Sequence, residues 1–118
     1  MDKDLRYLQE EIIRFRDARD WKQFHNPKDL ALSIVLEASE LMEHFQWKSQ
    51  NEVDVYVKSH KEDIGAEMSD VLNYLLILAN DLGIDLLGVS LRKLAKNNEK
   101  YSVKNAKGNH TKYTEFTK

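Results

Sequence analysis

The chain has 118 residues, 42% hydrophobic and 32% charged, and 18 Lys and Arg against 20 Asp and Glu give a net charge of −2. This length suits one domain. The absence of cysteine excludes disulfides, thiolate metal sites and a cysteine nucleophile. The apolar runs are too short to cross a bilayer, and residues 1–4 lack the basic start of a signal peptide. We therefore expect a soluble, cytoplasmic protein.

Charge is distributed unevenly along the chain. From Arg92 to Lys118 there are eight basic and two acidic residues, whereas the rest carries ten basic and eighteen acidic residues. Nucleic-acid binding usually requires a basic face across the folded body. We therefore expect neither nucleic acid nor membrane as a partner. This charge distribution is consistent with an acidic site that binds cations and a basic tail that contacts phosphate. It is equally consistent with a tail that is only solvated.

Apolar residues recur at helical spacing in the first half of the chain, where Gly and Pro are scarce. The spacing predicts a first helix over Asp4–Arg19, followed by a turn through Trp21–Asn26. A second helix is expected from Lys28 to Lys48, with Pro27 at its start. Residues 51–59 are expected to form a short helical or turn segment.

The second half predicts two more helices. A long helix is expected over residues 61–82, ended by Gly83. Asp85 is expected to cap a last helix that reaches about residue 98. From Ser102 onward the sequence is polar and rich in Lys, and we expect it to be extended.

These elements predict an all-α fold, a bundle of four to five helices around one core, because no segment shows convincing strand alternation. Residues 1–101 are expected to form the domain and residues 102–118 a Lys-rich tail. Residues 71–78 are apolar on nearly every side, which favours dimerisation because such a helix needs neighbours all round. His60 and His110 have no expected partners and are predicted to lie on the surface.

Two of the predicted helices carry acidic pairs with the same spacing. Glu37 and Glu40 lie on one helix, and Glu67 and Asp70 on the other. Residues three apart share a helix face. At about 100° per residue, each pair lies on the same flank of the apolar stripe of its helix. An isolated pair of this kind usually faces solvent, but a surface pair has no reason to repeat this relation to the stripe.

If the two apolar stripes pack together, the four carboxylates converge at the edge of the core. Like charges at such separations repel, and they cannot all remain ionised at neutral pH without cations. Oxygen ligands favour Mg²⁺ or Mn²⁺. Other chemistries lack their residues: a di-iron bundle requires Glu-x-x-His, but position 43 is Glu and position 73 is Asn. Zinc-hydrolase motifs and glycine-rich phosphate loops are also absent.

The two acidic pairs, separated by 26 residues, resemble the signature of the all-α, MazG-like nucleoside triphosphate pyrophosphohydrolases. Residues 19–28, 37–48 and 67–75 are similar to the dCTP pyrophosphatase branch of that family. Lys93-x-x-x-Asn97-x-x-Lys100-Tyr101 is similar to the closing basic motif of the family. One departure is Ile12, at a position where the mammalian branch has a His.

The resemblance implies a helical bundle that assembles as a homodimer or as a homotetramer, a dimer of dimers. It implies Mg²⁺-dependent hydrolysis of a (deoxy)nucleoside triphosphate, with dCTP or a modified dCTP as the expected substrate, to the monophosphate and pyrophosphate; Mn²⁺ is expected to substitute. The alternatives are a dUTPase-like all-α enzyme with the same metals and a non-catalytic helical dimer that binds nucleotide or a partner.

The resemblance also implies three groups of site residues. The metal ligands are Glu37, Glu40, Glu67 and Asp70, of which Glu40 is also the catalytic candidate that orients or deprotonates the attacking water. The base pocket consists of Trp21, Phe24, His25, Trp47 and Tyr74, for which core or dimer packing is the alternative role. The phosphate-binding residues are Lys93, Asn97 and Lys100, for which the alternative is an ordinary basic helix end.

Overall fold

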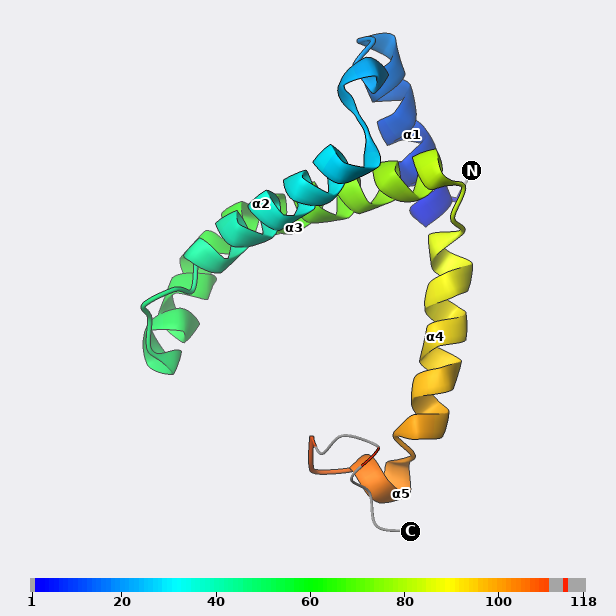
Figure 1. Ribbon diagram of the computed structural model, residues 1–118. Helices are drawn as coiled ribbons and strands as arrows, with labels where there is room; N and C mark the ends of the chain where they lie inside the picture. Colours follow the sequence, from blue (N-terminus) through cyan, green and yellow to red (C-terminus); the bar gives the residue numbers. More distant parts are fainter. Residues whose placement is uncertain (1, 111–113, 115–118) are drawn as a thin grey trace. The chain divides into compact units, whose positions relative to one another are not determined.

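The computed structural model describes residues 2–110 and 114 as two compact units, Met1–Ile84 and Asp85–Lys118 (Figure 1). The first unit contains α1 (Leu5–Ala18), a short 3₁₀ turn η1 (Lys22–Phe24), α2 (Pro27–Glu43) and α3 (Gln50–Leu82). The second unit contains α4 (Leu86–Lys100) and α5 (Val103–Ala106). No strand occurs among the described residues, and the predicted all-α class is confirmed.

Each α-helix begins after a residue with strong capping propensity, and α3 also ends at one. The Asn26 side chain caps α2, and Pro27 occupies the first turn, where a missing N–H costs nothing. Ser49 and Glu52 form a reciprocal capping box at the start of α3. Gly83 ends α3 with a left-handed φ of 68°, a conformation that glycine adopts without steric cost.

The helix α2 is shorter than predicted, because it ends at Glu43 and not at Lys48. Residues 44–47 form turns, and Trp47 adopts a left-handed φ of 68°. Since α3 begins directly after Ser49, the chain reverses direction within these few residues. The reversal lays α2 alongside the middle of α3 (Figure 1).

The helix α3 joins two segments that the sequence analysis separated. Only His60 departs from helical geometry, with φ −126° and ψ 20°. Its ring stacks on that of Tyr56 at 3.8 Å, and its Nδ1–H donates to the Tyr56 carbonyl oxygen at 2.9 Å. The expectation that His60 is a surface residue without partners is therefore wrong.

The second unit also differs from expectation near its end. The helix α4 runs to Lys100, and the Ser102 hydroxyl accepts a hydrogen bond from the Asn105 N–H. This cap starts the short helix α5, where an extended chain was predicted. Part of the predicted tail, residues 111–113 and 115–118, lies outside the described residues.

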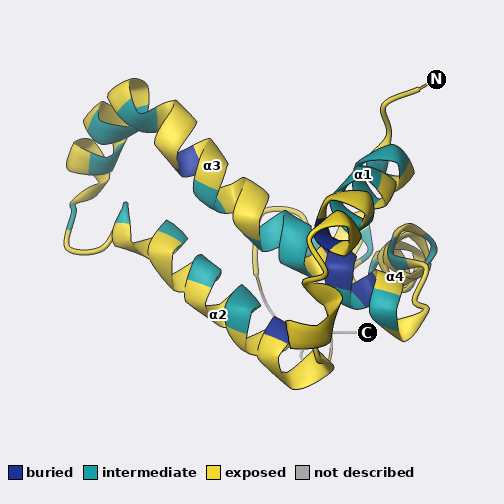
Figure 2. Ribbon diagram, turned by 90° about the horizontal axis from the view of Figure 1, so that it is seen from above, coloured by how far each residue is buried: buried dark blue, intermediate teal, exposed yellow. Residues whose placement is uncertain are grey.

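The apolar core of the first unit lies where α2 packs on α3. Figure 2 shows that buried positions are few and concentrated on these helices and α1. The buried apolar side chains are Leu30, Ile64, Leu76, Ile77 and Ala79. In the described part of the chain, no single helix has the length and apolarity to cross a membrane; α3 and α4 pass that test only as a pair, on length and composition alone.

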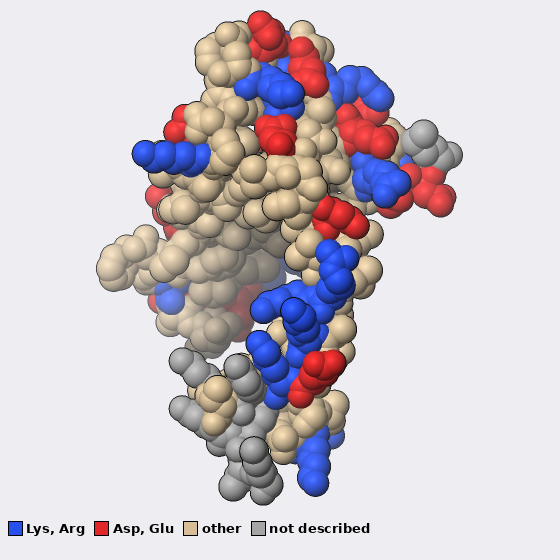
Figure 3. All heavy atoms as spheres, turned by 45° about the vertical axis from the view of Figure 1, so that its right-hand side comes forward, with Lys and Arg blue, Asp and Glu red and all other residues tan. Residues whose placement is uncertain are grey.

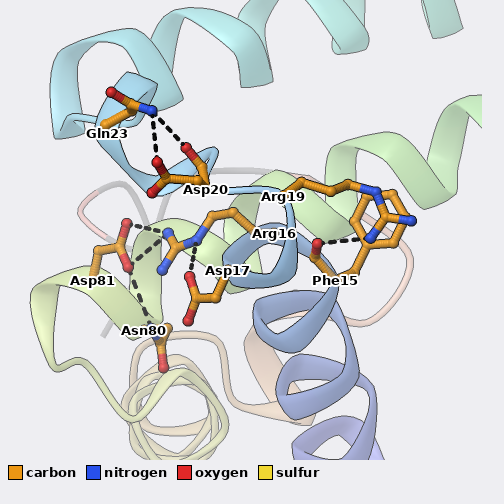
Figure 4. Close-up of polar contacts among 8 residues, drawn as sticks. All are labelled: Phe15, Arg16, Asp17, Arg19, Asp20, Gln23, Asn80 and Asp81. Atoms are coloured by element: carbon orange, nitrogen blue, oxygen red, sulfur yellow. Dashed lines mark hydrogen bonds and ion pairs between the residues drawn. The ribbon is translucent and has the colours of Figure 1, made fainter.

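One buried ion pair ties α1 to the end of α3 (Figure 4). Arg16 is only 2% exposed, and its guanidinium donates to both carboxylate oxygens of Asp81 at 2.9 and 2.7 Å. A further hydrogen bond of 3.1 Å reaches Asp17. Burial opposes the charge of Asp81, but the hydrogen bonds from Arg16 outweigh burial and lower the pKa of the Asp81 carboxyl. The pair therefore stabilises the position of α1 against α3.

Replacing Asp81 by Ala should lower the free energy of unfolding by about 3 kcal/mol, because Arg16 would remain buried without its main partner. Denaturant titration of the two proteins measures the difference. Asp63→Ala, at an exposed position of the same helix, should change it by less than about 0.5 kcal/mol. Equal losses from the two substitutions would contradict this role of the ion pair.

The same pair predicts a pH dependence. The folded pKa of Asp81 lies below its unfolded value of about 3.9. Its contribution to stability is therefore complete above the unfolded value and is lost as the pH falls through the folded value. The difference between wild type and Asp81→Ala should shrink as the pH falls below about 4.

Candidate active site

The packing of α2 on α3 brings acidic side chains from the two helices together. One carboxylate oxygen from each of Glu37, Glu67 and Asp70 lies within 4.8 Å of the others. Glu37 comes from the middle of α2, and the other two come from the middle of α3. Three of the four proposed metal ligands thus converge on one point.

Glu40 lies beside the same point, one turn after Glu37. The pKa values of Glu37 and Glu67 are both raised, first by burial, next by the carboxyl of Glu40 and then by that of Asp70. All four acids therefore interact. We call Glu37, Glu40, Glu67 and Asp70 the acidic cluster.

The acidic cluster fits a hard divalent cation. The Oε2 atoms of Glu37 and Glu67 are buried and have no hydrogen-bond partner within residues 2–110. Buried polar atoms are ordinarily paired, so two orphaned carboxylate oxygens that face like charges point to a cation as the missing partner. Ligand sets made only of carboxylate oxygens suit Mg²⁺, Mn²⁺ or Ca²⁺ better than softer ions.

A cavity of about 540 Å³ adjoins the acidic cluster, since Asp70 lines its wall. The helix α1 and the turn after it form one side, and α3 forms the other. The lining residues are Glu11, Ile12, Phe15, Arg16, Trp21, His25, Asp70, Asn73, Tyr74 and Ile77. The volume falls in the range of small-molecule sites in proteins.

Local contacts position the aromatic rim of this cavity. Asp20 adopts a left-handed φ of 54°, and the Gln23 amide donates to its carbonyl and carboxylate oxygens at 2.9 and 3.1 Å (Figure 4). The Trp21 N–H then donates to the Arg16 carbonyl at 3.2 Å. The Trp21 ring meets Phe15 edge-on at 5.7 Å. The turn thus fixes Trp21 against α1.

The expected base-pocket residues divide into two groups. Trp21, His25 and Tyr74 line the cavity. Phe24 and Trp47 do not line it and are 66% and 92% exposed.

The expected phosphate-binding residues lie in the second unit. Lys93, Asn97 and Lys100 follow one another on α4 at intervals of four and three residues, which places them on one face. Figure 3 shows that Lys and Arg gather along this helix.

The sequence analysis did not identify Asn73 and Ile77 as cavity residues. At about 100° per residue both lie on the same side of α3 as Asp70. Helical spacing from Asp70 could therefore have identified them. The contribution of Ile12, Phe15 and Arg16 had no such signal, because it depends on how α1 packs against α3.

Comparison with known proteins places this arrangement in a family. The MazG-like family matches residues 32–116 of the chain. The dCTP pyrophosphatase 1 proteins of Mus musculus and Homo sapiens are each 40% identical over 116 residues, covering 97% of this chain and 66% of their own length. This chain thus spans slightly less than two thirds of these relatives.

A solved structure gives the same result. A pyrophosphatase from Archaeoglobus fulgidus DSM 4304 superposes with a TM-score of 0.80 at 37% identity, over 86% of this chain and 95% of that protein. The likeness extends to the fold as well as the sequence. The chain belongs to the MazG-like family.

Proposed function

We propose that this protein is a Mg²⁺-dependent nucleoside triphosphate pyrophosphohydrolase that converts dCTP to dCMP and pyrophosphate. The observation that carries the proposal is the acidic cluster, with its two unpaired buried oxygens, beside a cavity rimmed by aromatic residues. The names of the mouse and human relatives support dCTP as the substrate. Such a substrate favours a cytoplasmic location.

The residues of the chain divide the work of this reaction. Glu37, Glu40, Glu67 and Asp70 would hold the cation, and Glu40 would also accept a proton from the attacking water. Trp21, His25 and Tyr74 hold the base in the cavity, so that the reacting phosphates lie over the acidic cluster. When bound, Mg²⁺ neutralises charge on the phosphate oxygens and makes water more acidic. Lys93, Asn97 and Lys100 are proposed to bind phosphate oxygens.

Replacing Glu40 by Gln should lower kcat at least about a hundredfold, because the variant keeps the side-chain shape and loses the proton acceptor. Chromatographic separation of dCMP, dCDP and pyrophosphate measures turnover and identifies the bond that breaks. Glu43→Gln, an exposed acid on the same helix, is the matched control and should retain activity. Formation of dCDP and phosphate, or no turnover by wild type, would contradict the proposed reaction.

Glu67→Gln should distinguish two effects of the acidic cluster: the loss of stability that it causes without metal, and the stabilisation that it gives when Mg²⁺ binds. Without metal, the variant should melt a few degrees above wild type, because Glu67 has a raised pKa and its ionised form is disfavoured in the folded state. This penalty is complete above the folded pKa and disappears as the pH falls below the unfolded value. Differential scanning calorimetry in EDTA at pH 7.5 measures the effect.

Addition of Mg²⁺ should make wild type melt at a higher temperature than Glu67→Gln. At ten times Kd, binding should stabilise wild type by about 1.4 kcal/mol, and Glu67→Gln should lose most of that gain. Glu43→Gln should respond as wild type does. An identical Mg²⁺ response in wild type and Glu67→Gln would exclude a metal site at the acidic cluster.

We also propose that the chain forms a homodimer, or a tetramer built from two such dimers, through the outer face of α2. Leu32 lies one turn before the adjacent residues Val35 and Leu36, and the three are 54%, 61% and 55% exposed. An apolar groove lies at the end of α2 and the turn after it, lined by Ala38, Leu41, Met42, Phe45 and Gln46. A stripe of this kind at helical spacing is typical of a helix that packs on another.

The double variant Leu32→Glu with Val35→Glu should be a monomer, because two buried charges in an apolar contact cannot be solvated. Light scattering after size exclusion gives the mass, and circular dichroism checks that the helices persist. Lys61→Glu introduces a charge at an exposed polar position and should leave the mass unchanged. A wild-type protein that is monomeric at all concentrations would contradict the proposal.

A further inference from the structure

The polar groups that line the cavity fall into two kinds. The charged groups already interact with other side chains. Arg16 is hydrogen-bonded to Asp81 and Asp17, and Glu11 forms an ion pair with Arg14. Asp70 belongs to the acidic cluster. The other polar groups are the Trp21 indole N–H, which can only donate, and the side chains of Asn73, Tyr74 and His25, none of which makes a hydrogen bond with another described residue. These three side chains and the Trp21 donor are the groups left to recognise a ligand.

Each of these three side chains can either donate or accept a hydrogen bond. The Asn73 carboxamide carries both kinds of atom and exchanges them by a half-turn of its last torsion. The Tyr74 hydroxyl donates or accepts by rotation, and neutral His25 does so by a change of tautomer. Because no described neighbour holds these three in one orientation, they present no fixed pattern of donors and acceptors.

The two pyrimidine edges differ only in such a pattern. Cytosine has a 4-amino donor beside an N3 acceptor, whereas uracil has a 4-oxo acceptor beside an N3–H donor. An amide pairs with either edge through two hydrogen bonds, in one orientation for cytosine and in the flipped orientation for uracil. The Trp21 indole offers a single donor, which suits the 2-oxo group that both bases share.

Asn73 is placed to read this edge. It lies three residues after Asp70 on α3 and half-buried in the cavity wall, so its side chain is a neighbour of an acidic-cluster carboxylate on one helix face. A nucleotide with its phosphates at the acidic cluster can then extend its base along α3. Ile12, Phe15 and Ile77 supply the apolar wall around the amide.

Building on the proposed function, we propose that Asn73 is the base-reading residue of this cavity and that the enzyme uses 4-amino and 4-oxo pyrimidine nucleotides almost equally. Selectivity for dCTP over dUTP requires an acceptor or a donor locked in one orientation, and Asn73 is not locked. The site therefore recognises a base edge that carries one donor and one acceptor, whichever of the two positions holds the donor.

The test compares kcat/KM for dCTP and dUTP in wild type, Asn73→Asp and Asn73→Leu. The two values should differ by less than tenfold in wild type. Asn73→Asp should shift the ratio towards dCTP by about tenfold, because a carboxylate accepts from the 4-amino group and has no donor for the 4-oxo group. Asn73→Leu, of similar size, should lower both values by fivefold or more. Asn51→Asp makes the same chemical change at an exposed position and should leave the ratio unchanged.

Three results would overturn the inference: a wild-type ratio above tenfold, a shift below fivefold in Asn73→Asp, or a loss below fivefold in Asn73→Leu. Calorimetric binding of the α,β-imido analogues of dCTP and dUTP, with the same thresholds on Kd, keeps this test independent of turnover. If the analogues bind with the expected pattern and no triphosphate is hydrolysed, the proposed function fails and the base-reading role stands. If neither analogue binds, both fail.

Discussion

Repulsion among carboxylates at the contact between α2 and α3 is the constraint on which the site depends. Burial and neighbouring acids raise the pKa values of Glu37 and Glu67, and each keeps one buried oxygen without a partner. Such an arrangement opposes folding unless a ligand compensates it. Under the proposed function, the fold accepts this loss of stability because a bound cation would compensate it.

The cavity depends on a second electrostatic contact of opposite character. Arg16 and Asp81 neutralise each other inside the core and need no ligand. They hold α1 across α3, and the turn after α1 then presents Trp21 to the space between them. The first unit therefore contains one satisfied ion pair that builds the cavity wall and one acidic cluster with unpaired buried oxygens, which is the proposed metal site. The Arg16–Asp81 pair already satisfies its charges, so only the acidic cluster has carboxylate oxygens available for a ligand.

Local signals in the sequence predicted much of this structure. The acidic pairs were identified because helical spacing alone places them on one flank, and Gly83 and Asp85 mark helix boundaries by their own conformational preferences. Features that join distant residues were not predicted. Arg16 and Asp81 lie 65 residues apart in sequence, and the reversal through Trp47 depends on how α3 packs back on α2. Only one side of the cavity could be predicted from spacing along α3, because the contribution of α1 depends on how the two helices pack.

The helix α3 combines both parts of the site. Glu67 and Asp70 face the acidic cluster, and Asn73, Tyr74 and Ile77 continue along the same side into the cavity. Because these residues share one rigid helix, the spacing between the charged and the base-binding ends is set by the rise of about 1.5 Å per residue. Changes in base preference can then arise at position 73 or on α1 without disturbing the carboxylates. If the proposed function holds, the spacing on α3 would keep the carboxylates in place, and single side chains one turn away would set the base preference.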